Sequence, residues 1–268
     1  MDSRPIGVFD SGVGGLSVLK ELVKLLPKER YIFVADQANV PYGEKTKKEL
    51  EKETLKICDF LVSKNSKVIV VACNTATCYA IEFLRAALKI PLVGTVPAIK
   101  PAAEESRPGV IAVMSTPVTS KSVYLKNLVK DYAGNVRVVN VGCPGLENAV
   151  ETGTLNSPEV RRLLLKYTKP IKRAGADIIV LGCTHYPFLK SEIKKAAGKN
   201  VKLVDSGKAL AKHTKNVLHQ MGALSTSRTY RTSPTCVDFY TTGSSAQFSK
   251  VASSLLKRRI EAKHLSLQ

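Results

Sequence analysis

The sequence predicts an α/β fold of two pseudo-symmetric lobes, each a mainly parallel sheet flanked by helices, with a site in the cleft between them. Short runs rich in valine and isoleucine alternate with longer amphipathic patterns along the chain, which is typical of βαβ construction. A strand–cysteine–helix unit occurs in each half, in VIVVACNTATCYAIEFL and in DIIVLGCTHYPFLKSEI. With 268 residues, 44% of them hydrophobic, the chain has enough apolar surface for real cores.

The expected strands are short apolar runs bounded by turn residues, as in sheets buried on both faces. Amphipathic helices such as Lys47–Val62 and Glu159–Arg173 lie between them. In chain order, the predicted strands are Ile6–Phe9, Tyr31–Ala35, Lys67–Ala72, Leu92–Gly94, Val110–Met114, Val136–Val141, Asp177–Leu181, Lys202–Val204 and Val237–Tyr240.

Two segments are the expected crossings between the lobes. The stretch Pro97–Pro101 is the first, and the segment near Asp205 is the return. A weak internal echo supports two related lobes, because the tripeptide DSG occurs at Asp10–Gly12 and again at Asp205–Gly207. We therefore expect a discontinuous first lobe, residues 1–97 plus 207–268, and a second lobe of residues 98–206.

The chain is strongly basic, with 41 Lys and Arg against 22 Asp and Glu and a net charge of +19. Such an excess attracts nucleic acid, anionic lipid and anionic metabolites without defining a site. No RRM, zinc-finger or helix-turn-helix signature accompanies it, aromatic residues make up 6%, and tryptophan is absent, so a solvated basic surface is favoured. Neither a secretory signal nor a long uncharged apolar run is present, so we expect a cytoplasmic protein without a membrane partner.

The six cysteines contain no CxxC pair, and a reducing cytosol disfavours disulfides. Cys58 and Cys78 fall in helical patterns and Cys236 in a strand-like run, so all three are interpreted as small buried hydrophobes. Cys143, before a proline at a strand end, is left open, with a structural role favoured.

Cys73 and Cys183 each end a strand and begin a helix. In open α/β sheets the ligand crevice lies beyond the carboxyl ends of the strands, so two such thiols can face one small molecule. A thiol on each side of one carbon suggests that a proton is removed from one face and delivered to the other. A helix N-terminus lowers a thiol pKa, so we expect both cysteines to be reactive.

Several polar residues beside these cysteines are candidates for the same site. Asp10 and His185 are placed to tune the two thiols, although an ordinary structural role is the alternative for each. Asn74, Thr75 and Thr184 either cap helices or bind a substrate carboxylate.

Other chemistries fit the sequence less well. The cysteine and histidine spacings match no zinc site, so no metal is expected. The loop DSGVGG completes neither a P-loop nor a dinucleotide fingerprint, and no lysine stands in a context for pyridoxal phosphate, so no cofactor is expected.

Four motifs together, GVFDSGVGGLSV, ADQANVPYG, ACNTAT and GCTHYP, resemble those of glutamate racemases in order and over nearly the whole chain. The resemblance implies a cofactor-independent interconversion of L- and D-glutamate that supplies D-glutamate for peptidoglycan. Cys73 would deprotonate D-glutamate with help from Asp10, and Cys183 would deprotonate L-glutamate with help from His185. The implied substrate contacts are Ser11, Tyr42, Gly43, Asn74, Thr75, Thr184 and Glu151.

Two alternatives stay open at this point. The same two-cysteine plan serves aspartate and other amino-acid racemases, although the form GCTHYP resembles the glutamate-specific branch. The charge of +19 suggests an association with nucleic acid or with DNA gyrase, or a field that draws in a dianionic substrate. Oligomeric state, including a homodimer, is left open by the sequence.

Overall fold

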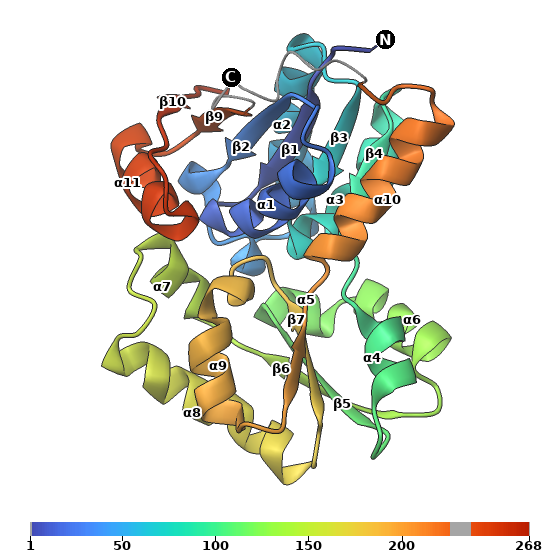
Figure 1. Ribbon diagram of the computed structural model, residues 1–268, viewed down its shortest axis with the longest axis vertical. Helices are drawn as coiled ribbons and strands as arrows, with labels where there is room; N and C mark the ends of the chain where they lie inside the picture. Colours follow the sequence, from blue (N-terminus) through green and yellow to red (C-terminus); the bar gives the residue numbers. More distant parts are fainter. Residues whose placement is uncertain (1, 226–236, 268) are drawn as a thin grey trace.

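Two parallel β-sheets, one in each lobe, form the framework of the molecule (Figure 1). The computed structural model describes residues 2–225 and 237–267. The first sheet has six strands in the order β10-β9-β2-β1-β3-β4, and the second has four in the order β6-β5-β7-β8. The strands are β1 Ile6–Asp10, β2 Tyr31–Ala35, β3 Val68–Val71, β4 Leu92–Gly94, β5 Val110–Ser115, β6 Arg137–Gly142, β7 Ile178–Gly182, β8 Lys202–Val204, β9 Val237–Thr241 and β10 Ala262–His264.

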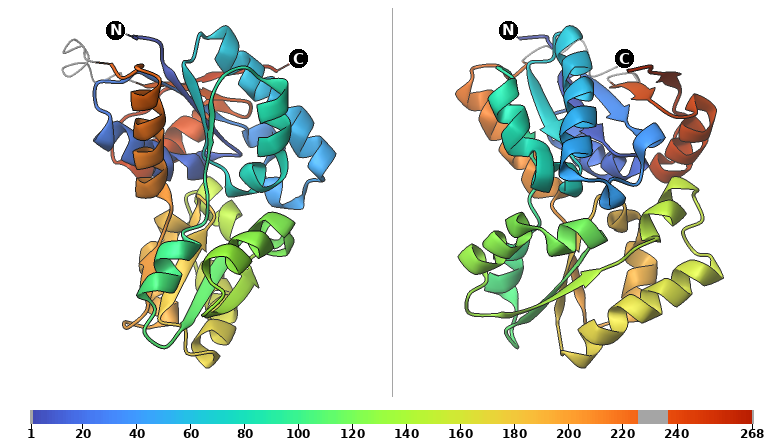
Figure 2. Two further views of the ribbon diagram at one scale, coloured as in Figure 1. Left: turned by 90° about the vertical axis from the view of Figure 1, so that its right-hand side faces the viewer. Right: turned by 180° about the vertical axis from the view of Figure 1, so that it is seen from behind.

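Helices cover both faces of each sheet (Figure 2). The first lobe carries α1 Leu16–Leu25, α2 Lys47–Ser63, α3 Asn74–Ala87, α10 Gly207–Gln220 and α11 Ser245–Leu256. The second carries α4 Ile99–Glu105, α5 Pro117–Lys121, α6 Val123–Tyr132, α7 Leu146–Glu151, α8 Pro158–Arg173 and α9 Lys190–Ala197. Short 3₁₀ turns are η1 Val13–Gly15, η2 Gln37–Asn39, η3 Tyr42–Glu44 and η4 Tyr186–Leu189.

The continuous apolar strands follow from this double cover. Successive side chains of a strand point to opposite faces, and along β3 Val68 and Val70 join one buried cluster while Ile69 and Val71 join another. In the second lobe Ile179 and Ile178 divide in the same way. Since both faces are buried there, central strands such as β3 and β7 are unbroken apolar runs in the sequence.

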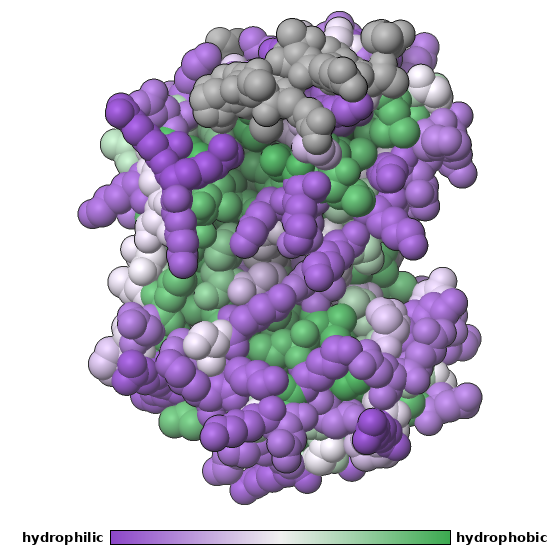
Figure 3. Space-filling model, in the orientation of Figure 1, coloured by the Kyte–Doolittle hydropathy of each residue, from purple (hydrophilic) through white to green (hydrophobic). Residues whose placement is uncertain are grey.

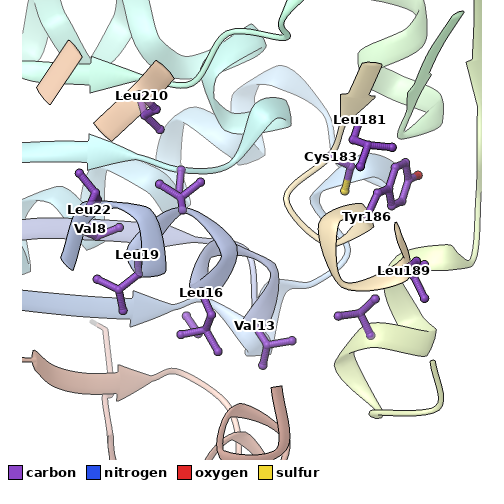
Figure 4. Close-up of a cluster of buried hydrophobic side chains, with 14 of the residues drawn as sticks. Val8, Val13, Leu16, Leu19, Leu22, Leu181, Cys183, Tyr186, Leu189 and Leu210 are labelled. Atoms are coloured by element: carbon purple, nitrogen blue, oxygen red, sulfur yellow. The ribbon is translucent and has the colours of Figure 1, made fainter. Parts of the chain in front are cut away.

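One apolar cluster extends through both lobes. It contains Val8 and Leu16 of the first lobe together with Leu181, Cys183 and Tyr186 of the second. Figure 4 shows α1 side chains on one side of this region and the segment that follows β7 on the other. The lobes therefore meet through packed side chains.

Within its described part, the chain passes between the sheets twice, after β4 and again between β8 and α10. Both passages lie where the crossings were expected, near Pro97–Pro101 and Asp205. The domain limits of 97/98 and 206/207 stay a prediction, and the sheet membership is compatible with them.

The prediction of a two-lobed α/β fold with mainly parallel sheets is confirmed, and each predicted strand is present to within a residue or two at its ends. The strand β10 was not predicted. It is an edge strand whose Lys263 and His264 are exposed, and it pairs with β9 from Ala262 to His264. Cys236 lies outside the described residues.

Candidate functional site

The carboxyl ends of the central strands of both sheets meet at one cavity between the lobes. Its walls enclose about 310 Å³ of space not filled by atoms, counting the mouth open to solvent. Because parallel strands all end at the same edge of a sheet, the segments that follow β1 and β3 face those that follow β5 and β7. The lining residues are Ser11, Val40, Pro41, Tyr42, Gly43, Cys73, Asn74, Thr75, Thr116, Glu147, Cys183, Thr184 and His185.

Both strand-end thiols line this cavity. Cys73 follows β3 and is the N-cap of α3, where its Sγ accepts a hydrogen bond from the backbone N–H of Ala76 at 3.4 Å. Cys183 follows β7, and its Sγ lies 3.5 Å from Nδ1 of His185. They are 5% and 6% exposed, so little bulk water reaches either sulfur.

The expectation that its position at a helix N-terminus lowers the pKa of Cys73 is wrong for the unliganded site. Burial raises the pKa of Cys73 well above its ordinary value, and the nearby charge of Asp10 raises it further. The backbone N–H of Ala76 acts in the opposite direction but does not outweigh them. Cys73 is therefore a thiol, carrying its proton, in the free protein.

Asp10 lies behind the cavity wall and is fully buried. Its Oδ2 accepts hydrogen bonds from the backbone N–H of Gly15 at 2.7 Å and from the hydroxyl of Thr184 at 3.2 Å. Burial raises the pKa of Asp10, while the positive charge of His185 opposes that rise. Asp10 thus connects the first lobe to the residue that follows Cys183.

Glu151 holds His185 from the side opposite Cys183. Its Oε1 lies 2.6 Å from Nε2 of His185 and accepts the backbone N–H of Val13 at 2.7 Å. Its Oε2 accepts a hydrogen bond from the side chain of Gln37 at 2.6 Å. Glu151 is not among the cavity-lining residues but contacts His185, and its predicted contact with the substrate stays a prediction.

The charge of His185 is set by these two neighbours. Burial lowers its pKa, but the hydrogen bonds and charges of Cys183 and Glu151 outweigh burial and hold the pKa well above the ordinary value. A protonated imidazole donates from both nitrogens, to the sulfur on one side and to the carboxylate on the other.

The glycines of DSGVGG bring the first lobe against this assembly. A Cβ at Gly14 would lie 2.5 Å from Nδ1 of His185, and one at Gly12 would lie 1.9 Å from Oε1 of Glu151. Real Cβ atoms do not approach so closely, so only glycine allows η1 to pack here. The loop that resembles a phosphate loop serves in this structure as a close-packing surface.

Two further residues predicted to contact substrate, Tyr42 and Thr75, already form hydrogen bonds within the protein through their hydroxyl groups. The hydroxyl of Tyr42 donates to Asp36 at 2.6 Å. The hydroxyl of Thr75 lies 3.1 Å from those of Thr116 and Thr119, which belong to the other lobe. These contacts fix the positions of η3 and α3 at the cavity.

The structure brings together most of the residues singled out in the sequence. Ser11, Tyr42, Gly43, Asn74, Thr75 and Thr184 line the cavity with Cys73, Cys183 and His185, whereas Asp10 and Glu151 lie behind them. Their functional roles stay predictions.

Four lining residues were not expected from the sequence, Val40, Pro41, Thr116 and Glu147. Thr116 could have been found, because it follows a strand and precedes a proline at a helix start, as an N-cap does. Glu147 shares the segment CPGLENAVETG with Glu151, and nothing in the sequence says which glutamate faces the cavity.

The remaining described cysteines lie outside the cavity lining. Cys58 and Cys143 are buried and Cys78 is partly buried. Within residues 2–225 and 237–267, no group of three His, Cys, Asp or Glu side chains is arranged to hold a metal ion. Over the same ranges, no helix is long and apolar enough to cross a membrane.

Known proteins share both the sequence and the fold. The sequence model of the family described as Asp/Glu/Hydantoin racemase matches residues 6–214. A glutamate racemase of Herpetosiphon aurantiacus is 44% identical over 255 residues, covering 95% of this chain and 99% of that protein. One from Methylococcus capsulatus is 44% identical over 242 residues, covering 90% of this chain and 88% of the other.

Solved structures agree with these relatives. Glutamate racemase isoform RacE1 from Bacillus anthracis superposes with a TM-score of 0.86 at 32% identity, covering 100% of this chain and 99% of that one. The Escherichia coli glutamate racemase, in complex with L-glutamate and the activator UDP-MurNAc-ala, gives 0.85 at 30% identity, with 99% of each chain covered. An aspartate racemase from Picrophilus torridus, at 17% identity and a TM-score of 0.56 over 85% of this chain and 97% of its own, shares the fold alone.

Proposed function

This chain belongs to the Asp/Glu/Hydantoin racemase family, and we propose that it interconverts L- and D-glutamate without a cofactor, using two cysteines as acid and base. The observation that carries the proposal is that Cys73 of one lobe and Cys183 of the other line a single cavity. The similarity to glutamate racemases supports glutamate as the substrate. Its product would supply D-glutamate for peptidoglycan, which fits the expected cytoplasmic location.

The reaction needs a base on one face of the α-carbon and an acid on the other. With L-glutamate, the Cys183 thiolate takes the α-proton, so that a C–H bond breaks and an S–H bond forms. The electron pair left on carbon is delocalised into the α-carboxylate. The thiol of Cys73 then delivers its proton to the opposite face and becomes a thiolate, ready for D-glutamate.

The surroundings of Cys73 and His185 fit these roles. Burial and Asp10 keep the proton on Cys73, whose pKa is raised. Protonated His185 lies 3.5 Å from Cys183 and offers its Nδ1–H to a thiolate there. Each turnover exchanges the protonation states of the two cysteines.

Carboxylate binding is left to neutral donors. Among the described residues that line the cavity there is no lysine or arginine. Asn74, Thr75, Thr116 and Thr184 bring amide and hydroxyl groups to the walls, and we assign the α-carboxylate of the substrate to them and to nearby backbone N–H groups.

The test is α-proton exchange in D₂O for Cys73→Ser and Cys183→Ser, followed by proton NMR, with circular dichroism to follow inversion. Each variant should lose racemisation by a factor of about 100 or more, because a positioned acid or base contributes that much. Cys73→Ser should still exchange the proton of L-glutamate without inversion, and Cys183→Ser that of D-glutamate.

Cys78→Ser, in the same helix as Cys73 but outside the cavity lining, is the matched control and should racemise normally. Full turnover in Cys73→Ser or Cys183→Ser would eliminate the two-cysteine mechanism. If the unaltered protein exchanges aspartate and not glutamate, the substrate assignment is wrong and the aspartate alternative replaces it.

Two finer statements about partners stay predictions. A homodimer is open, as is an association with nucleic acid or DNA gyrase, which is motivated by the net charge of +19 alone.

A further inference from the structure

One carboxyl group in the cavity wall has no assigned task. Glu147, the second residue of α7, is 4% exposed and lines the cavity that holds both thiols. Its Oε2 is buried, and no group in the described part of the chain forms a hydrogen bond with that atom. A buried carboxylate oxygen without a donor is costly, so this atom requires a partner that the described residues do not supply.

The groups around Glu147 do not stabilise a full negative charge. Burial raises its pKa and the charge of Glu44 on η3 raises it further, whereas His185 and backbone N–H groups act in the opposite direction without outweighing burial. Its other titratable neighbours are Cys143, Tyr167 and Tyr186, whose own pKa values are raised.

The position of Glu147 indicates which part of a substrate it meets. In the proposed reaction the α-carbon lies between the two sulfurs. The charge of Asp10 acts on Cys73 at this position and raises its pKa. Glu147 instead lines the cavity from α7, an element separate from those that carry the thiols, and the charges of His185 and Glu44 act on its carboxyl group. A carboxylate two methylene groups from the α-carbon lies away from the thiols, and Glu147 is the one acidic residue among the described cavity-lining residues that can meet it.

Two carboxyl groups that meet in a buried site cannot both ionise, and they share one proton. The described cavity lining offers no lysine or arginine to neutralise a second carboxylate. A protonated glutamic acid is a hydrogen-bond donor, and its bond to a carboxylate is short and strong.

We propose that Glu147 binds the distal carboxylate of the substrate as a neutral acid, with Oε2 donating the hydrogen bond. The inference rests on the proposed racemase function and deepens it. It identifies a binding residue that selects a substrate with a second carboxylate, and it couples substrate binding to uptake of a proton.

Two substitutions separate the hydrogen bond from the titration. Glu147→Gln keeps a donor of the same shape but cannot ionise, whereas Glu147→Leu removes the donor. Leucine should raise KM for both enantiomers about tenfold to a hundredfold with a smaller effect on kcat, as expected for a lost hydrogen bond to a charged group. Glutamine should restore a KM near that of the unaltered protein.

The pH dependence gives a signature that a structural role would not. KM of the unaltered protein should rise as the pH increases through the pKa of Glu147, because the ionised form repels the substrate. KM of Glu147→Gln should lack this rise. Glu159→Gln, an exposed glutamate on α8, is the control and should behave as the unaltered protein does.

Calorimetric titration with L-glutamate in buffers of different ionisation enthalpy measures the proton uptake directly. The unaltered protein should take up as much as one proton more than Glu147→Gln. Equal uptake, a KM in Glu147→Gln as poor as in Glu147→Leu, or tighter binding by Glu147→Gln at every pH would each overturn the inference.

If the proposed racemase function is wrong, the same experiments give a different result. In that case the unaltered protein neither exchanges the α-proton of either enantiomer nor releases heat on titration with L-glutamate, and the inference falls with it. Normal racemisation with unaffected Glu147 variants overturns the inference alone.

Discussion

His185 is held between a thiol and a carboxylate, and the carboxylate decides its charge. Glu151→Gln keeps the shape of the side chain but removes the negative charge at 2.6 Å from Nε2. Burial then acts with less opposition, so the pKa of His185 should fall. NMR titration of the histidine ring nitrogens, with His185→Asn to assign the resonance, measures the shift.

The same pair makes stability depend on pH. The folded-state pKa of His185 is raised above its unfolded value, so its contribution is fully present below the unfolded pKa and is lost as the pH rises through the folded pKa. The difference in unfolding free energy between the unaltered protein and Glu151→Gln should therefore shrink as the pH rises through that window. A difference that stays constant with pH would contradict the charged pair.

At this scale the sequence predicts residue types better than their contacts. Cys73, Cys183 and His185 are visible because each lies at the end of an apolar strand or two positions beyond it, and the topology brings strand ends together. Glu147 and Glu151 lie one helical turn apart, and only the packing of α7 shows that one lines the cavity while the other contacts His185.

At the scale of elements, η1 packs closely against the second lobe, and a substitution at Gly14 tests how much space remains there. Gly14→Ala would place a methyl group 2.5 Å from Nδ1 of His185 and 2.7 Å from the hydroxyl of Thr184. Because the ring must move, we expect kcat to fall about a hundredfold, as a displacement of about 1 Å can cause. Steady-state kinetics and thermal unfolding measure the two effects separately.

Gly134→Ala is the matched control, since its Cβ would meet the carbonyl oxygen of Lys130 at 3.7 Å, an ordinary contact distance. That variant should retain kcat. An unchanged kcat in Gly14→Ala would mean that His185 can shift without consequence for the reaction.

Element prediction succeeded where burial on both faces leaves a continuous apolar run, as in β3 and β7. It failed at β10, where Lys263 and His264 are exposed and the strand exists because β9 offers an edge. Pairing of this kind depends on a neighbouring strand more than on any local pattern in the sequence.

For the whole molecule, the charge of +19 should act on the rate of substrate capture. Long hydrophilic side chains cover much of the face that carries α1, α9 and α10 (Figure 3). Glutamate is an anion at neutral pH, so a positive field raises its encounter rate. We expect kcat/KM to fall with added NaCl while kcat changes little, as measured by circular dichroism, because salt screens the field. A flat kcat/KM would show that the charge has no part in capture.

The pairing of β2 with β9 has a consequence for the order in which the protein matures during translation. The four strands of the second sheet all emerge from the ribosome before β9 does, while the edge of β2 waits uncovered. Thr241 and Thr242, at and just beyond the end of β9, donate hydrogen bonds to Gln37 and Asp36, which in turn contact Glu151 and Tyr42. The surroundings of the cavity are therefore completed last by a C-terminal strand. A nascent chain that already contains both thiols still lacks β9 and the hydrogen bonds that β9 and the residue after it make to Gln37 and Asp36.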